Sequence, residues 1–312
     1  MTMKKGKSTL GMSREDWLDE RRKSIGGSDA GAILGLNPYA SAYSLWAEKT
    51  GKIPSPDLED KEAVRLGHDL EDYVAARWCE ATGKKVQRCN FFLYNDAYPF
   101  AHALPDRMVV GEKAGLECKT TSSWDVIKQC RDGKYPDAWY AQIMHYLMVT
   151  GFDTWYLSVV CFGKGYYKFE IKRDEAEIAA LAQAEREFWG YVETRVPPPT
   201  DGSEATQEAI RTIYADSSPY CVDLGAVESA LRQRAAIKKQ IGELQELMNE
   251  QDAIVQTFMG EAERGESANW KVTWKEQERS TFDRKKWEAD HGQIPAQYMK
   301  VSTSRTFRVT AR

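Results

Sequence analysis

The stretch AGLECKTT, residues 114–121, places an acid and a lysine two positions apart. It is short and β-prone, and turn-forming or small polar residues flank it, so we expect a strand. Successive side chains of a strand point to opposite faces. Glu117 and Lys119 therefore share one face, and Leu116 and Cys118 share the other. A surface salt bridge is one explanation of such a pair, and a catalytic site is the alternative.

A second acid, Asp106, precedes this stretch in the sequence LPDRM. We predict three strands in a meander over 85–96, 100–110 and 114–121. Asp106 is expected at the turn into the strand that precedes 114–121. Adjacent strands lie about 4.8 Å apart, so Asp106 can meet Glu117 across the pair. Two carboxylates this close raise each other's pKa unless a cation shares the site. A hard divalent metal such as Mg²⁺ is held by one or two carboxylates, waters and phosphate oxygens. Lys119 beside them can orient or deprotonate a water, or meet negative charge in the transition state, as phosphodiester cleavage requires.

Helical patterns surround the predicted strands. Ser13 and Asp16 indicate a capping box, and Ser28 is the expected N-cap of a short helix in GGSDAGAILGLNPY. Further helices are expected at 42–51, 55–83, 123–133, 136–151 and 175–195, and a hairpin at 153–174. This order predicts an α/β (α+β) fold, with a mixed central sheet flanked by helices.

The linker VPPPTDGSEA, 196–205, divides the chain into predicted domains 1–198 and 199–312. Behind it, apolar residues recur every seven positions in two interleaved series, with polar interruptions at Arg234 and Gln251. This pattern predicts one coiled-coil-like helix about 48 Å long. The tail after 267 is expected to form two strands around a short helix. The extension is interpreted as a helical hairpin, an intersubunit contact or a partner dock.

Composition excludes several protein classes. The 312 residues carry a net charge of −4, so DNA binding would need a local basic surface. The six cysteines form no C-x-x-C pair, which disfavours zinc ribbons and iron–sulfur clusters. Neither a signal peptide nor an apolar run of membrane-spanning length is recognised, so a reduced, cytoplasmic protein is expected.

Four blocks in order carry a family resemblance: ERRKSIGGSDAGAILGLNPY, GHDLE, Pro105-Asp106 with GLECK, and AQIMHYLMVTG. Together they resemble the lambda exonuclease and YqaJ-like viral recombinase family of the PD-(D/E)XK nuclease superfamily. The resemblance covers residues 17 to about 195, and no counterpart of residues 200–312 exists in the lambda enzyme.

The resemblance implies a role for each matched residue. Asp106, Glu117 and the backbone carbonyl of Cys118 match metal ligands, and Glu71 matches a helix-borne acid near the metals. Lys119 matches the catalytic lysine, and Gln142 matches a glutamine that shapes the active site. Arg21 and Ser28 fall where the family binds the 5′-phosphate, with neighbouring Arg22 as the alternative arginine. Taken singly, Glu71 could be a solvated face residue, Gln142 a backbone partner and Ser28 only a cap.

The function that the resemblance implies is a Mg²⁺-dependent alkaline exonuclease with two metal ions, for which Mn²⁺ can substitute. It would digest linear double-stranded DNA 5′→3′ and leave 3′ overhangs for a single-strand annealing protein. The family forms ring-shaped oligomers, trimers in the lambda case, in the cytoplasm of a bacterial host of phage or prophage. The alternatives are another PD-(D/E)XK endonuclease, a DNA-binding module without chemistry, or a recombination scaffold.

Overall fold

The stretch 114–121 is the central strand of the fold in a computed structural model, which describes residues 3–55, 61–302 and 304–310. This strand, β6 (Ala114–Thr121), lies in a five-stranded sheet of order β2-β5-β6-β7-β8. It pairs parallel with β7 and antiparallel with β5, so the sheet is mixed as predicted. The other members are β2 (Val86–Arg88), β5 (Arg107–Val109), β7 (Thr154–Cys161) and β8 (Gly165–Lys172).

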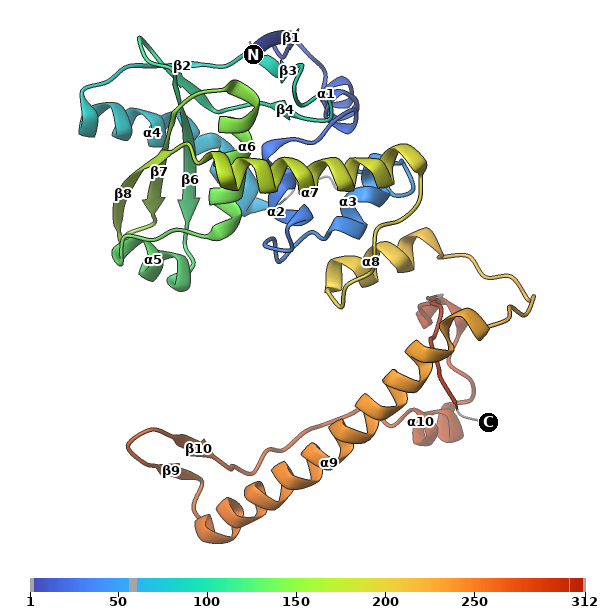
Figure 1. Cartoon of the computed structure of the whole chain (residues 1–312). Helices are drawn as coiled ribbons and strands as arrows, with labels where there is room; N and C mark the ends of the chain where they lie inside the picture. Colours follow the sequence, from blue (N-terminus) through green and yellow to red (C-terminus); the bar gives the residue numbers. More distant parts are fainter. Residues whose placement is uncertain (1–2, 56–60, 303, 311–312) are drawn as a thin grey trace. The chain divides into compact units, whose positions relative to one another are not determined.

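The alternation along β6 separates two apolar layers. Leu116 faces a small cluster under helix α4 (Glu62–Thr82), where Trp78 is fully buried. The opposite face packs against helix α6 (Asp137–Thr150) and the main core. Residue 115 lies on that second face. It is a glycine because a Cβ there would stand 2.2 Å from the ring of Trp155. Figure 1 shows α6 and α7 (Glu175–Thr194) beside the strands β6, β7 and β8.

Five further helices belong to this part of the chain as the structure describes it, and all of them except α1 contribute residues to the main core. They are α1 (Arg14–Arg22), α2 (Gly27–Ile33), α3 (Ala42–Lys49), α5 (Trp124–Arg131) and α8 (Glu204–Ile213). The helix predicted over 55–83 is α4, and its positions 56–60 lie outside the described residues. No helix within the described ranges combines the length and apolar character needed to cross a membrane.

Two of the predicted strands are wrong as single elements. The stretch 85–96 divides into β2 and β3 (Phe91–Asn95), and 100–110 divides into β4 (His102–Ala103) and β5. Strands β2 and β5 join the large sheet, whereas β3 and β4 join β1 (Met3–Ser8) in a separate sheet. Pro105 explains the second break because proline has no N–H to donate to a strand neighbour. The carboxylate of Asp106 follows directly at this break.

The chain divides into two compact units, 1–215 and 216–312. The second contains the 3₁₀ turn Gly225–Val227, α9 (Glu228–Met259), β9 (Arg264–Glu266), β10 (Lys271–Thr273), α10 (Arg284–His291) and the 3₁₀ turn Ala296–Tyr298. The long helix predicted from the heptads is therefore present. Of the two strands predicted around the short helix, the one before it is present as β10, which pairs with β9. No strand occurs in the described residues after α10.

Helix α8 makes the position of the domain boundary testable. It lies after the boundary predicted at 198, yet it packs on α3, where Thr206 Oγ1 donates to Ser41 Oγ at 2.7 Å and Ala209 is buried. We expect a fragment 1–215 to fold, and a fragment 1–198 to lose about 2–4 kcal/mol of stability because it exposes the surface under α8. Thermal unfolding of the two purified fragments measures this as a Tm difference of roughly 10 °C. Equal Tm values would place the boundary at 198.

Candidate active site

The side chains of Glu117 and Lys119, both on strand β6, lie on the side of the sheet that faces α6. Lys119 Nζ lies 2.7 Å from Glu117 Oε1 and donates to Gln142 Oε1 at 3.0 Å. Gln142 Nε2 in turn donates to Glu117 Oε1 at 2.7 Å and to the hydroxyl of Tyr146 at 2.9 Å. Glu117 is only 2% exposed. The acid, the lysine and the glutamine selected from the sequence thus form one closed hydrogen-bonded group.

Asp106 joins this group from the neighbouring strand. Arg107 lies opposite Leu116 in the antiparallel pairing of β5 and β6, so Asp106 stands at the level of Glu117. Its Oδ2 accepts a hydrogen bond from the amide of Cys118 at 2.7 Å. The same cysteine was predicted to offer its carbonyl to a metal, and that role stays a prediction.

Arg107 links Glu71, on helix α4, to the backbone of Asp106. The sequence did not predict a role for this arginine. Arg107 is buried, donates from Nη1 to Glu71 Oε1, and donates from Nη2 to Asp72 Oδ1 at 2.6 Å. Its Nη1 also donates to the carbonyl of Asp106 at 2.6 Å. The only signal for this role was an arginine directly after the Pro-Asp pair, and that position alone does not say where the side chain turns.

The electrostatics of the group call for a cation. Burial, then the charges of Glu117 and Glu71, raise the pKa of Asp106 well above its usual range. Glu117 Oε2 is buried and has no hydrogen-bond partner. Burial opposes the charge of Lys119, but Glu117 and Asp106 outweigh it, so the pKa of Lys119 is raised. An orphaned carboxylate oxygen beside a second carboxylate fits a divalent metal.

Glu71 lies near Asp106, where its charge contributes to the raised pKa of that carboxyl, and it forms an ion pair with Arg107. Among the described residues, no group of three or more His, Cys, Asp or Glu side chains is arranged to hold one ion. Asp106 and Glu117 are the two carboxylates whose surroundings fit a metal such as Mg²⁺, which is bound by one or two carboxylates when waters and phosphate complete its shell.

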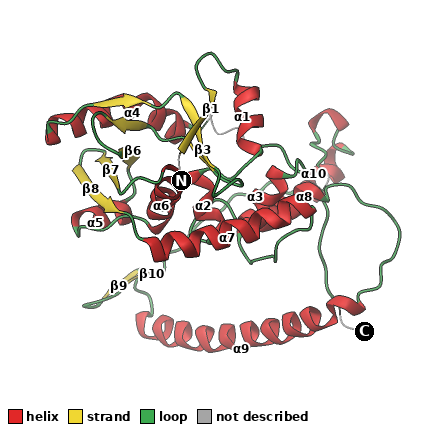
Figure 2. Cartoon of the chain, turned by 45° about the horizontal axis from the view of Figure 1, so that its top comes forward, coloured by secondary structure: helices red, strands yellow, loops and turns green. Residues whose placement is uncertain are grey.

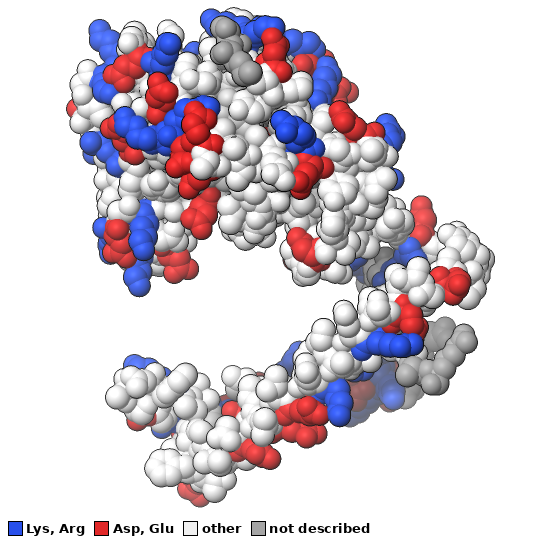
Figure 3. All heavy atoms as spheres, in the orientation of Figure 1, with Lys and Arg blue, Asp and Glu red and all other residues white. Residues whose placement is uncertain are grey.

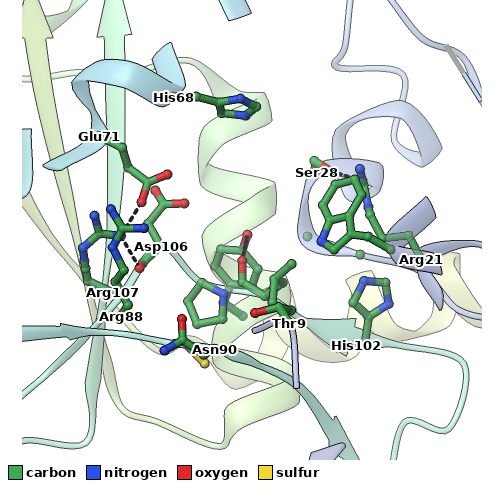
Figure 4. Close-up of a pocket in the computed structure, with 17 residues that line it drawn as sticks. Thr9, Arg21, Ser28, His68, Glu71, Arg88, Asn90, His102, Asp106 and Arg107 are labelled. Carbon is green, nitrogen blue, oxygen red and sulfur yellow. Dashed lines mark hydrogen bonds and ion pairs between the residues drawn. The ribbon is translucent and has the colours of Figure 1, made fainter. Parts of the chain in front are cut away.

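A pocket of about 360 Å³ connects Asp106 and Glu71 to the predicted phosphate site, and Glu117 and Lys119 are not among its lining residues. Arg21 and Ser28 line it together with Glu71 and Asp106 (Figure 4). In this view the arginine and serine lie on one side of the pocket and the two acids on the other. His68 also lines the pocket. Further lining residues that the sequence did not single out are Arg88, Asn90 and His102.

Arg21 is held by a buried network. Its Nη2 donates to Ser28 Oγ at 2.9 Å and lies 3.5 Å from Asp29 Oδ1, and its guanidinium stacks 4.8 Å from the ring centre of Trp17. Lys49 Nζ binds Asp29 Oδ2 at 2.7 Å and donates to the carbonyl of Arg21 at 2.8 Å. Burial opposes the charge of Asp29, but Lys49 and Arg21 lower its pKa. Both the backbone and the side chain of Arg21 are therefore fixed toward the pocket.

The structure corrects the prediction that Ser28 is an N-cap, and it bears on the choice between Arg21 and Arg22. Ser28 is not the N-cap of its helix: Gly26 is, and the Asp29 side chain accepts from the Gly26 amide at 2.9 Å. The aspartate takes the capping contact, which leaves the serine hydroxyl with Arg21. Arg22 pairs with Asp19 at 2.9 Å and does not line the pocket, which favours Arg21 as the arginine of the site.

Comparisons with known proteins identify relatives of this chain. Residues 16–153 match the YqaJ-like viral recombinase domain. YqaJ of Bacillus subtilis (strain 168) is 39% identical over 302 residues, covering 95% of this chain and 93% of the relative. The relative therefore includes a counterpart of the C-terminal unit.

Solved structures share the fold of the first unit. The structure of LHK-Exo in complex with dAMP aligns with a TM-score of 0.50 and 20% identity, over 58% of this chain and 93% of that chain. Another structure of LHK-Exo, the alkaline exonuclease from Laribacter hongkongensis, aligns with a TM-score of 0.49 and 19% identity over the same shares. The mixed α/β architecture is thus similar to that of an alkaline exonuclease. With the sequence match over nearly the whole length, the chain belongs to the YqaJ-like viral recombinase family.

Proposed function

We propose that this chain is a divalent-metal-dependent deoxyribonuclease that digests linear duplex DNA from 5′ ends. One observation carries the proposal: a single pocket holds the carboxylate of Asp106 at one side and the arginine–serine pair at the other. The chemistry of phosphodiester cleavage and the recognition of a terminal phosphate would thus occur in one cavity. Family membership and the fold shared with LHK-Exo, which was solved with the nucleotide dAMP, support this reading.

Asp106 and Glu117 would hold the metal, with Glu71 beside them and the Cys118 carbonyl as a further ligand. The proposed ion is Mg²⁺, with Mn²⁺ as a substitute and two ions in the complete site. A bound divalent ion lowers the pKa of its water and neutralises charge on the phosphate oxygens. Gln142 fixes the orientation of Glu117 and Lys119, because it bonds to both. Tyr146 extends this support to the carbonyl of Leu104, two residues before Asp106, at 3.3 Å.

Lys119 acts as a cation in this proposal. Its raised pKa keeps the ammonium protonated at neutral and mildly alkaline pH. A protonated lysine cannot accept the proton of the attacking water. It can donate hydrogen bonds to that water or to the phosphate, where negative charge grows in the transition state.

Arg21 and Ser28 would bind the phosphate at the 5′ end. A guanidinium offers several N–H donors to a phosphate, and charge-assisted bonds of this kind are worth about 1.5–3 kcal/mol each. A chain end seated there would carry its first phosphodiester bond toward Asp106. Digestion would then proceed 5′→3′ and leave 3′ overhangs, the substrate of a single-strand annealing protein. A ring of subunits, a trimer as in the lambda enzyme, would keep the enzyme on its DNA.

The test compares cleavage of DNA substrates that differ at their 5′ ends. Linear duplexes with 5′-phosphate or 5′-hydroxyl and closed circles are incubated with and without Mg²⁺, and released nucleotides are quantified. We expect cleavage only with metal, none of the circles, and faster digestion of the phosphorylated duplex. Arg21→Gln should reduce the preference for 5′-phosphate by roughly tenfold, which corresponds to one charge-assisted bond.

Arg22→Gln is the matched control, since Arg22 turns to Asp19 and should leave the preference unchanged. Equal digestion rates for the 5′-phosphate and 5′-hydroxyl duplexes would contradict the proposal that Arg21 and Ser28 bind the terminal phosphate. Nicking of closed circles would identify an endonuclease, and undiminished cleavage in excess EDTA would refute the metal mechanism.

A further inference from the structure

Helix α9 presents an apolar stripe to solvent along its whole length. It is drawn as one uninterrupted helix in Figure 2, and it has no buried residue. We define the seam as the heptad a and d positions of α9 and of the N-cap residue before it, which are Val227 at the N-cap and then Ala230, Arg234, Ile237, Ile241, Leu244, Met248, Gln251, Val255 and Phe258. Its large apolar members are between 41% and 92% exposed. A stripe of this kind is a surface for a partner helix.

The charges of α9 are segregated along the helix. Apart from Glu228, the basic residues all precede the acidic ones: Arg232, Arg234, Lys238 and Lys239, then Glu243, Glu246, Glu250 and Asp252. On the face drawn in Figure 3, blue atoms lie toward the N-terminal part and red atoms toward the C-terminal part of this helix. An isolated helix prefers the opposite order, because its dipole favours acids at the N-terminus and bases at the C-terminus. The stability of a single α9 therefore does not explain its charge order.

An antiparallel copy of the same helix is compatible with this charge order. Reversing the helix places the basic half of one copy alongside the acidic half of the other. With the seam at heptad positions a and d, Lys238 and Asp252 flank it at e, and the other charged residues outside the seam lie at b, c and f, on the side away from a partner helix.

The seam fixes the register of such a pair. In an antiparallel coiled coil, a positions of one helix pack against d positions of the other. One alignment places Arg234 opposite the partner's Gln251, so the two polar interruptions share a layer. The same alignment gives only apolar layers elsewhere, namely Ile241 with the partner's Leu244, Met248 with the partner's Ile237, Val255 with the partner's Ala230, and Val227 with the partner's Phe258. A parallel pair would instead place Arg234 against the partner's Arg234.

We propose that α9 forms an antiparallel two-helix interface with α9 of a second copy of this chain, in the register that pairs Arg234 with the partner's Gln251. The occupant of the seam is thus a second copy of the chain, because one helix carries both members of each layer and its two polar interruptions, Arg234 and Gln251, fall together when it pairs with itself. Within the chain, Arg234 contacts the ring of Phe307 at 5.9 Å, and that side chain is itself 80% exposed. This contact touches one layer and leaves the other seam residues uncovered.

The first test measures the mass of the full-length protein in solution by light scattering. Leu244→Asp introduces a charge into a central layer and should halve the mass relative to the unmodified chain, whatever other contacts the nuclease unit makes. Ala253→Asp adds the same charge to α9 outside the seam and should leave the mass unchanged. Circular dichroism checks that both variants keep their helix. An identical mass for the Leu244→Asp variant and the unmodified chain would overturn the interface, and a different protein would then have to occupy the seam.

The second test determines orientation by disulfide formation, in a Cys221→Ser background because Cys221 is an exposed thiol. Ala230→Cys and Val255→Cys are prepared separately, oxidised alone and oxidised as a mixture. The positions lie about 38 Å apart on one helix. The proposal predicts cross-linked dimers only in the mixture, since residue 230 lies opposite the partner's residue 255. Cross-linking of each variant with itself would show a parallel pair, and no cross-linking in any sample would also overturn the register.

Discussion

Asp106→Asn should lower DNA cleavage by about 10³-fold, because it removes the charge of one of the two carboxylates that would hold the metal. Metal-assisted charge stabilisation is worth several kcal/mol, and each 1.36 kcal/mol corresponds to tenfold in rate. Asparagine keeps the shape of the side chain, and its oxygen can still accept from the Cys118 amide. Initial rates on 5′-phosphorylated duplex at saturating Mg²⁺ measure the loss. Asp132→Asn, a change of an exposed aspartate, is the control and should retain full activity.

The same variant should be more stable than the unmodified chain in metal-free buffer. The pKa of Asp106 is raised in the folded protein, so the folded state holds its proton to higher pH than the unfolded state does. Stability is then lost as pH rises from the unfolded pKa through the folded pKa, so this carboxyl contributes less to stability at pH 8 than at acidic pH. Asparagine removes that charge. A higher Tm with EDTA, and a Tm that no longer rises on adding Mg²⁺, are expected. Cleavage within tenfold of the unmodified rate would exclude Asp106 as a metal ligand.

The centre of the site could be predicted because it depends on a local rule. Glu117 and Lys119 share a face of β6 since strands alternate with period two, and Asp106 meets them since it starts the adjoining strand. Residues that act across the fold carried no such local rule. Arg107 is a buried arginine whose partner on α4 lies far away in sequence, and only the assembled structure brings it to Glu71.

Strand pairing shows a second limit. The runs 85–96 and 100–110 are continuous β-prone sequences, and the pattern alone does not reveal that each divides between two sheets. The first strand, β1, could not be predicted because its lysine-rich sequence resembles an exposed tail, and pairing with β3 provides its hydrogen bonds. The parallel pairing of β6 with β7 likewise depends on helices α5 and α6 between them. Heptads, by contrast, are local, and the repeat that runs from Val227 to Phe258 predicted α9 (Glu228–Met259).

The role of Lys119 is decided by a pair of substitutions. Lys119→Met removes the ammonium and keeps most of the side-chain volume, and we expect a loss of about 10²–10⁴-fold in kcat/KM, the range of a single catalytic group. Lys119→Arg restores a positive charge and should recover about tenfold over methionine, although its planar group cannot reproduce the bonds to Glu117 and Gln142. The same Lys→Met change at exposed Lys168 should leave the rate unaltered.

The pH dependence of these variants separates a cation from a base. Because the folded-state pKa of Lys119 is raised above its usual 10.5, the ammonium persists across the alkaline range. If it acts as a cation, the Lys119→Met variant should keep the shape of the pH–rate profile between pH 7 and pH 10 at a uniformly lower rate. If it acts as a base, the reactive form is the neutral amine, whose share grows about tenfold per pH unit below the pKa. Methionine would then abolish that rise, and arginine, which does not lose its proton, would give no recovery. A flat profile for Lys119→Met together with an inactive Lys119→Arg would therefore reverse the assignment, and would require Glu117 to give up its ion pair during the reaction.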